Sequence, residues 1–162
     1  MTQTKSTVRS VIRGPGILLG VGLGGFVDGI VLHQILQWHH MLSETERYPP
    51  TTLANLQINT LADGFFHAAT WVSVFGGLWW LWRAVKAGGW QWSWRSLLGW
   101  MATGWGLFNV VEGVVNHHLL QIHQVRPGAA NPVVWDIGFL ILGALLIAGG
   151  LAMQQQEHPT SH

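Results

Sequence analysis

Four long apolar stretches alternate with shorter polar segments along the chain. They run from about 16 to 41, 55 to 82, 96 to 123 and 132 to 153. Each reaches the roughly 20 residues that a helix needs to cross a bilayer. The pattern therefore predicts an all-α membrane protein with four transmembrane helices. We expect one domain from 16 to 153, between a basic cytoplasmic leader (1–15) and a polar tail (154–162).

The composition supports a membrane protein and narrows its chemistry. Only 9% of the residues are charged and 49% are hydrophobic, whereas soluble domains carry about 25% charged residues. The net charge of +1 does not favour nucleic acid as a partner. The chain has no cysteine, which excludes disulfides, thiolate metal sites and Cys-ligated iron–sulfur clusters.

Basic residues predict the orientation in the membrane. Six of the eight Lys and Arg flank the end of the helices that carries both termini: Lys5, Arg9, Arg13, Arg83, Lys86 and Arg95. The positive-inside rule places that end in the cytoplasm. We therefore expect a multi-pass protein of the bacterial inner membrane with both termini cytoplasmic. The loops at about 42–54 and 124–131 would face outward.

The two halves of the chain repeat a polar pattern. Asp28, Gly29, His33, Leu36, Gln37 and His39 reappear 84 residues later as Glu112, Gly113, His117, Leu120, Gln121 and His123. Asp63 with Gly76-Gly77 reappears 73 residues later as Asp136 with Gly149-Gly150. These matches predict two duplicated helix hairpins (about 16–86 and 96–153). Together they would form a four-helix bundle with a pseudo-two-fold axis along the membrane normal.

Acids and histidines gather inside the predicted spans, although a charged side chain in a bilayer costs several kcal/mol. They share one band of depth in the outer half of the membrane: Asp28, Asp63, Glu112, Asp136, His33, His67 and His117. Carboxylates and imidazoles from facing helices are the ligands of di-metal sites in helix bundles. We therefore expect these seven residues to bind two metal ions, with Asp28 either a ligand or a support for one.

The helical geometry of this set is mixed. Asp63 and His67 are four residues apart and share a helix face. Asp28 and His33 are five apart, about 140° around an ideal α-helix, so both cannot point at one axis. Gly29 and Gly113 follow the acids and allow either a distorted helix or close packing. Otherwise one member of each pair faces a neighbouring helix.

Four other histidines lie toward the outer ends of the first and third spans: His39, His40, His118 and His123. We expect them at the membrane surface, as interface groups or as a path by which metal reaches the site. His67 has Leu140 as its counterpart in the second half, so the two half-sites should be chemically unequal. His158 and His162, in the polar tail, have no predicted role.

Several functions fit this ligand set. Mixed nitrogen and oxygen ligands suit iron, manganese, zinc or copper(II) and disfavour copper(I). With iron or copper, the protein would be a redox enzyme acting on a lipid-soluble or gaseous substrate, although the sequence identifies no catalytic residue. The alternatives are metal transfer or transport, and a structural or proton-handling bundle. A haem between His33 and His117 would leave the four acids unexplained.

The chain also resembles an uncharacterised family of predicted bacterial four-helix integral membrane proteins, over about residues 15–150. The resemblance rests on Asp28-Gly29, His33, Gln37, His39-His40, Asp63-Gly64, His67, Glu112-Gly113, His117-His118 and Trp135-Asp136. It implies the four-span topology but no activity. The lipid bilayer and metal ions are the expected partners, and the resemblance adds respiratory oxidase assembly or other metal-handling proteins.

Overall fold

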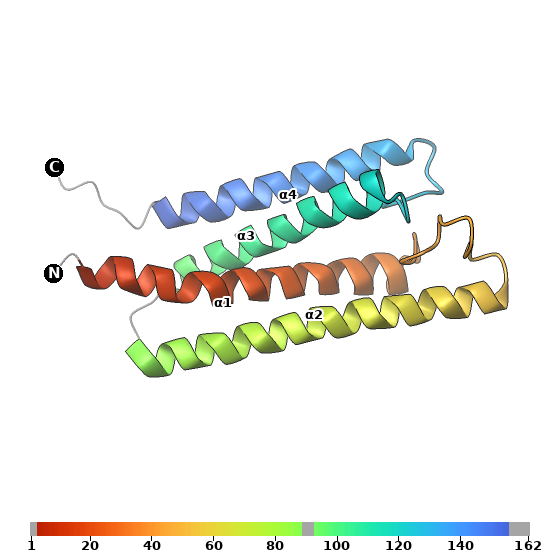
Figure 1. The fold of residues 1–162 in the computed structure, drawn as a ribbon. Helices are drawn as coiled ribbons and strands as arrows, with labels where there is room; N and C mark the ends of the chain where they lie inside the picture. Colours follow the sequence, from red (N-terminus) through yellow and green to blue (C-terminus); the bar gives the residue numbers. More distant parts are fainter. Residues whose placement is uncertain (1–2, 89–92, 156–162) are drawn as a thin grey trace.

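The computed structural model describes residues 3–88 and 93–155, which form a helical hairpin on each side of the gap. The four α-helices are α1 (Gln3–Val27), α2 (Leu53–Gly88), α3 (Trp94–Glu112) and α4 (Pro132–Gln155). Two π-helices, η1 (Asp28–Ile35) and η2 (Gly113–Leu119), directly continue α1 and α3. The two termini lie at one end of the helices and both hairpin connections at the other (Figure 1). Because α1 begins at Gln3, it includes most of the expected leader.

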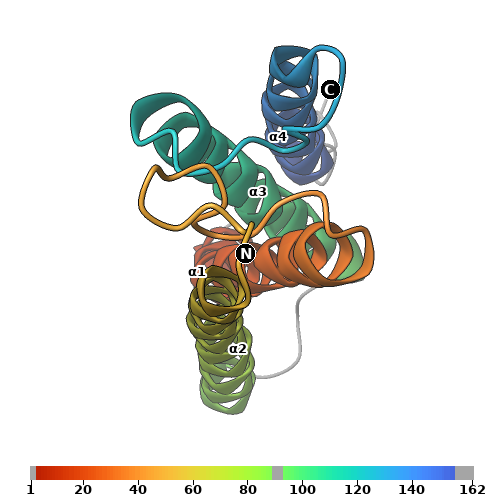
Figure 2. The ribbon, with the colours of Figure 1, turned by 90° about the vertical axis from the view of Figure 1, so that its right-hand side faces the viewer.

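Helices α1 and α3 form a central pair, and each outer helix packs on one of them. Helix α2 packs on α1 and α4 packs on α3, on opposite sides of the pair (Figure 2). Within the described residues α2 and α4 do not pack against each other, so the four helices do not enclose a common axis. The central pair is in close backbone contact: a side chain at Gly20 would collide with the Met101 carbonyl, and one at Gly104 with the Ile17 carbonyl.

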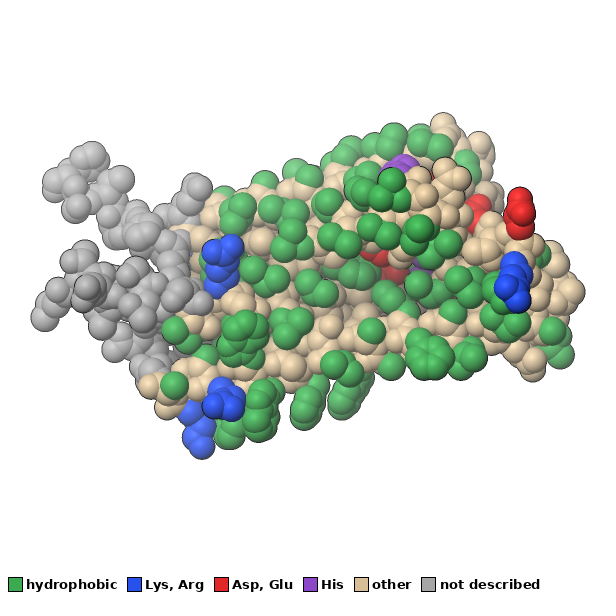
Figure 3. Space-filling view, in the orientation of Figure 1, with side chains coloured by type: hydrophobic (Ala, Val, Ile, Leu, Met, Phe, Trp, Pro, Cys, Tyr) green, Lys and Arg blue, Asp and Glu red, His purple; other side chains and the backbone are tan. Residues whose placement is uncertain are grey.

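The distribution of side chains is polar inside and apolar outside. Few hydrophobic side chains in the described ranges are fully buried: Ile12, Leu19, Leu97 and Val125. The buried set is dominated by polar residues, including all four intramembrane acids. Hydrophobic side chains cover the length of the molecule, whereas Lys and Arg lie near its two ends (Figure 3). Large exposed apolar surfaces of this kind mark contact with lipid or with another protein.

Two segments of the described chain are long and apolar enough to be candidate membrane spans. They are Val11–Ile35 and Pro132–Gln154. We expected four. Helices α2 and α3 are rich in Trp, Gly and polar residues, which lowers their mean hydropathy although both are long.

The first and third spans end earlier as helices than their apolar sequence predicts. We expected helix to about Met41 and His123, but regular structure ends at Ile35 and Leu119. Gln37 and Gln121 then adopt left-handed conformations, with φ of 49° and 50°. The Trp38 N–H donates to the Leu32 carbonyl at 2.9 Å, and the Ile122 N–H to the Asn116 carbonyl at 3.0 Å. These bonds resemble a Schellman ending widened by one residue, and they turn the chain back toward the helices.

Candidate metal centre

The π-helices place each acid and histidine of the central pair on one face. In a π-helix the backbone hydrogen bonds join residues five apart, so side chains at i and i+5 come together. Asp28 Oδ2 lies 3.3 Å from His33 Nε2. In η2, His117 Nε2 lies 3.1 Å from Glu112 Oε2. The sequence left open whether the helix is distorted at these pairs or one member of each pair faces a neighbouring helix. The structure contains the distorted helix.

A glycine directly after each acid allows the outer helix to approach. A side chain at Gly29 would come within 2.6 Å of His67 Nε2 on α2. One at Gly113 would come within 2.9 Å of a methyl group of Leu140 on α4. The two glycines therefore serve close packing as well, at the level where the acids enter the interior.

The carboxylate of Asp63 on α2 collects hydrogen bonds from the first half of the chain. It accepts from His33 Nδ1 at 3.0 Å, from His40 Nδ1 at 2.6 Å and from the Met41 N–H at 2.9 Å. Gln34 adds a longer bond at 3.3 Å. A carboxylate with this many donors fixes the orientation of the His33 ring and turns Nε2 toward the interior.

Asp136 on α4 holds the corresponding place in the second half. It accepts the Val125 N–H at 2.9 Å and lies 3.3 Å from His117 Nδ1. Met41 and Val125 are 84 residues apart, the same separation as His33 and His117. The two acids on the outer helices thus face the Nδ1 side of an imidazole, and the two acids on the central helices face its Nε2 side.

His39 and His123 lie in the interior, so the expectation that they sit at the membrane surface is wrong. Their exposed fractions are 3% and 0%. The physical reason is the left-handed turn at Gln37 and Gln121, which folds the chain back. His39 Nδ1 donates to the Val125 carbonyl at 2.8 Å, and His123 Nδ1 donates to the Met41 carbonyl at 3.2 Å. Each histidine therefore bonds to the backbone of the other half.

The other two histidines of that expected surface group behave differently. His118 is exposed, as expected. His40 is 14% exposed and bonds to Asp63. Of the four, two are therefore buried, one is partly exposed and one is exposed.

Four imidazoles from the two halves form one cluster. Ring centroids lie 4.5 Å apart for His33 and His39, 4.6 Å for His39 and His123, and 5.1 Å for His117 and His123. Two groups of buried side chains have potential ligand atoms within 4.8 Å of one another: His33, His39 and His123, and Glu112, His117 and His123. Three side chains at this spacing can hold a metal ion.

Several buried atoms of the cluster make no hydrogen bond of good geometry, although those of His33, His117 and Glu112 lie within 3.3 Å of an oppositely charged group. They are Nε2 of His33, Nε2 of His39, both ring nitrogens of His117 and Oε2 of Glu112. Buried polar atoms in proteins are nearly always paired, and a bound ion is one recognised reason for an exception. His123 Nε2 lies 2.8 Å from Glu112 Oε1, so this acid reaches both histidines of its half.

His67 joins neither ligand group. Its Nδ1 donates to the Asp63 backbone carbonyl one turn earlier on α2, at 2.8 Å. Its Nε2 is buried without a partner and packs beside Gly29. Of the seven residues that the sequence predicts, the structure brings Asp28, His33, Asp63, Glu112, His117 and Asp136 together and leaves His67 at the edge.

Comparison with known proteins gives a family. Residues 15–157 match a family described as "Predicted membrane protein (DUF2243)", which covers most of the chain. The chain belongs to this family. The resemblance noted from the sequence is thereby confirmed, and the family carries no assigned activity. No protein of curated function and no solved structure matches the chain.

Sequence reasoning missed the burial of two residues in this DUF2243 protein. His39 and His123 were matched to each other by the same offset as His33 and His117. That shared offset was the available signal, because a position kept polar in both halves is more typical of an interior site than of a surface. Extending the apolar pattern as a helix instead places both residues at the outer ends of their spans.

Proposed function

We propose that this DUF2243 protein is an integral membrane metal-binding protein with one ion in each half of a shared site. His33 and His39 would hold the first ion, with Asp28, 3.3 Å from His33, as the neighbouring carboxylate, and Glu112, His117 and His123 would hold the second. The observation that supports this most directly is the convergence of buried imidazole nitrogens and a carboxylate, with ligand atoms within 4.8 Å of one another. Neutral imidazole nitrogens and carboxylates are the atoms that divalent transition metals take.

In this proposal Asp63 and Asp136 orient ligands and do not bind metal themselves. Metal-bound histidines usually donate their other ring nitrogen to a carboxylate, which fixes the ring and strengthens the ligand. Asp63 accepts from His33 Nδ1, and Asp136 lies next to His117 Nδ1. This assignment departs from the sequence-based hypothesis, which made both acids ligands. It also omits His67.

We further propose that the halves are duplicated hairpins and that all four helices cross the inner membrane. Support for the duplication comes from contacts that recur at the same offsets. His39 and His123 exchange bonds with the carbonyls of Val125 and Met41, and Gly20 and Gly104 exchange close contacts with Met101 and Ile17. Support for four spans comes from the length of α2 and from the apolar surface along the molecule.

The half-sites would be unequal for a reason other than His67. Glu112 is one methylene longer than Asp28 and reaches His123 at 2.8 Å as well as His117 at 3.1 Å. Asp28 approaches His33 at 3.3 Å. We therefore expect the second half to bind its ion more tightly.

Burial of the cluster favours a resident ion over one in transit. His39 and His123, proposed from sequence to guide ions inward, belong to the site itself. A resident iron, manganese or copper(II) ion at this depth would support redox chemistry on a substrate that arrives through the lipid.

The test is the metal content and absorption spectrum of the protein purified in detergent, with a matched pair of variants. His117→Ala removes a buried ligand, whereas His118→Ala removes its exposed neighbour. We expect His117→Ala to lose about one ion per chain and His118→Ala to retain wild-type content. Chelation should lower the melting temperature of the wild type, because an ion bound only to the folded state stabilises it.

Three results would contradict the proposal. Wild-type protein that binds no transition metal after reconstitution would leave the acid–imidazole pairs as a structural or proton-handling network. Equal metal loss in His117→Ala and His118→Ala would show binding to surface histidines. A Soret band in the absorption spectrum would show that the protein binds haem in place of the two ions.

A further inference from the structure

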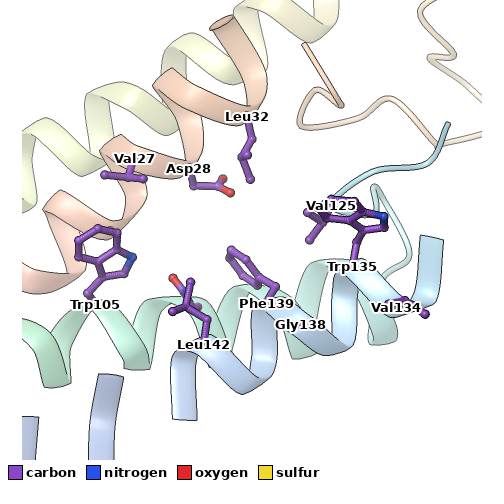
Figure 4. Close-up of a pocket in the computed structure, with 12 residues that line it drawn as sticks. Val27, Asp28, Leu32, Trp105, Val125, Val134, Trp135, Gly138, Phe139 and Leu142 are labelled. Carbon is purple, nitrogen blue, oxygen red and sulfur yellow. The ribbon is translucent and has the colours of Figure 1, made fainter. Parts of the chain in front are cut away.

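A cavity of about 450 Å³ lies beside the cluster, between the α1–η1 segment, α3 and α4. Its walls are mostly apolar, and three of the twelve lining residues are aromatic: Trp105, Trp135 and Phe139. Figure 4 shows the Asp28 carboxylate pointing into this space from η1. The volume falls in the range of small-molecule sites, about 300 to 1,000 Å³, which are apolar with a few placed polar groups.

Two buried acceptors line the cavity. Asp28 is 5% exposed and its carboxylate borders both the cavity and His33. Asn109 is 1% exposed, and its Oδ1 has no hydrogen-bond partner. A buried acceptor without a partner is costly, by about 1–3 kcal/mol. The occupant that relieves this cost is a molecule with hydrogen-bond donors, such as hydroxyl groups.

The outer end of the cavity is covered by stacked side chains. Trp135, which lines it, packs edge to face on Trp38 with ring centroids 5.1 Å apart. The Arg126 guanidinium lies 4.8 Å from the Trp38 ring and 5.0 Å from the Trp135 ring. Exposed apolar residues form the sides instead, with Val27 42% and Val134 60% exposed. The opening is therefore lateral, toward the surface that we assign to lipid.

A smaller cavity occupies the corresponding place in the second half. It measures about 320 Å³ and contains Glu112, as the first contains Asp28. Phe108 lines it at the position that Gly24 occupies in the first half. Positions 62 and 122, which correspond to Trp135 and Trp38, hold Ala and Ile, so the aromatic cover is missing there. The first cavity is thus the roomier and the better enclosed.

We propose that the cavity at Asp28 binds a lipid-soluble aromatic molecule that carries hydroxyl groups, of the quinol type. The aromatic walls stack on its ring, the carboxylate and the Asn109 amide oxygen accept its hydroxyl protons, and the lateral opening admits it from the bilayer. This inference rests on the proposed function only if the bound molecule is a substrate, because Asp28 would then connect that molecule to the metal site. Binding itself requires no metal.

The test compares two probes on the purified protein in detergent. Octylhydroquinone can donate hydrogen bonds, and its dimethyl ether cannot. The melting temperature should rise with octylhydroquinone and stay unchanged with the ether, because a ligand that binds only the folded state stabilises it. The measurement is made on metal-loaded and on chelated protein, with metal content determined in the same samples.

Matched variants locate the site. Gly138 lines the cavity, whereas Gly149 is exposed on the same helix and lines neither cavity. At both positions no atom lies within 4 Å of an added side chain. Gly138→Leu should abolish the shift, and Gly149→Leu should keep it. Leu142→Trp, at a partly exposed position of the wall, provides a second obstruction if Gly138→Leu folds poorly. Asn109→Leu should weaken the response without altering metal content.

The outcomes separate this inference from the proposed function. If only octylhydroquinone raises the melting temperature and the protein binds no metal, the inference about the cavity is supported and the proposed metal-binding function is contradicted. Normal metal content with equal shifts from both probes would make the cavity an ordinary lipid crevice and overturn the inference. A shift that survives both obstructing variants would place the probe elsewhere, which overturns it as well.

Discussion

His39 and His123 stack face to face, with ring centroids 4.6 Å apart and planes 6° from parallel. One ring comes from each hairpin, and each donates its Nδ1 proton to a backbone carbonyl of the opposite hairpin. These bonds place a proton on each Nδ1. Nε2 of His39 is then left without a partner, whereas Nε2 of His123 lies 2.8 Å from Glu112. The pair therefore links the two halves of the chain, and in the proposed function it gives each half-site a ligand.

This pairing predicts that replacing His39 and replacing His123 with a ring that lacks nitrogens lower the metal content by different amounts. His39→Phe and His123→Phe keep an aromatic ring at the stack but lose the carbonyl bond, worth about 0.5–1.5 kcal/mol. His123→Phe should release more metal, because His123 Nε2 also lies 2.8 Å from Glu112. Metal content and melting temperature measured beside His118→Phe, an exposed control, would test this. A larger loss in His39→Phe would contradict the order.

The acids on the outer helices, Asp63 and Asp136, should strengthen the binding of metal without contacting it. Asp63→Asn and Asp136→Asn are nearly isosteric but replace the carboxylate that faces an imidazole Nδ1. Removing such a partner typically weakens metal binding about 10- to 100-fold. We expect that range by competitive chelator titration, together with a lower melting temperature. Glu46→Gln, at an exposed position in the first connection, should change neither. Unchanged affinity in both buried variants would remove the assigned role.

His67 gives a test in which the sequence and the structure disagree. As one of seven ligands predicted from sequence, it should be needed for full metal occupancy. In the structure its Nδ1 bonds to its own helix and it joins neither ligand group. His67→Leu, which introduces the residue found at its counterpart Leu140, should therefore keep wild-type metal content. A lost ion in this variant would restore the sequence-based assignment.

The orientation in the membrane is open to a direct measurement. Reporter fusions after Gln155 and in the connection near Pro50 should report cytoplasm and exterior respectively, because most basic residues flank the terminal end. The reversed result would move the site to the cytoplasmic half of the bilayer. It would leave the cluster itself unchanged.

The helical class and the inward position of the acids could be predicted from the sequence because both follow from local properties. Long apolar stretches predict helices, and acids within them need interior partners. The offset of 84 also pairs His33 with His117 from the sequence alone. The mean hydropathy of α2 and α3 was less informative, because their Trp and Gly contribute little to it.

The turn after each π-helix could not be predicted, because no local signal marks it. The chain from Ile35 to Trp38 contains no glycine or proline. Gln37 adopts a positive φ, which residues other than glycine seldom take. Bonds between distant segments hold this conformation: the Met41 N–H with Asp63, and His39 with the Val125 carbonyl. Tertiary contacts therefore determine where the helix ends and bring His39 inside.

The π-helices also change how such sequences can be searched. Patterns built on α-helical periodicity look for ligands three or four residues apart, and they pass over a pair separated by five. Asp28 with His33, and Glu112 with His117, meet at 3.3 and 3.1 Å through that longer spacing. An acid followed by glycine, with histidine five positions after the acid in an apolar helix, is therefore a usable signature. It would identify interior ligand pairs in other membrane proteins that conventional motif spacing overlooks.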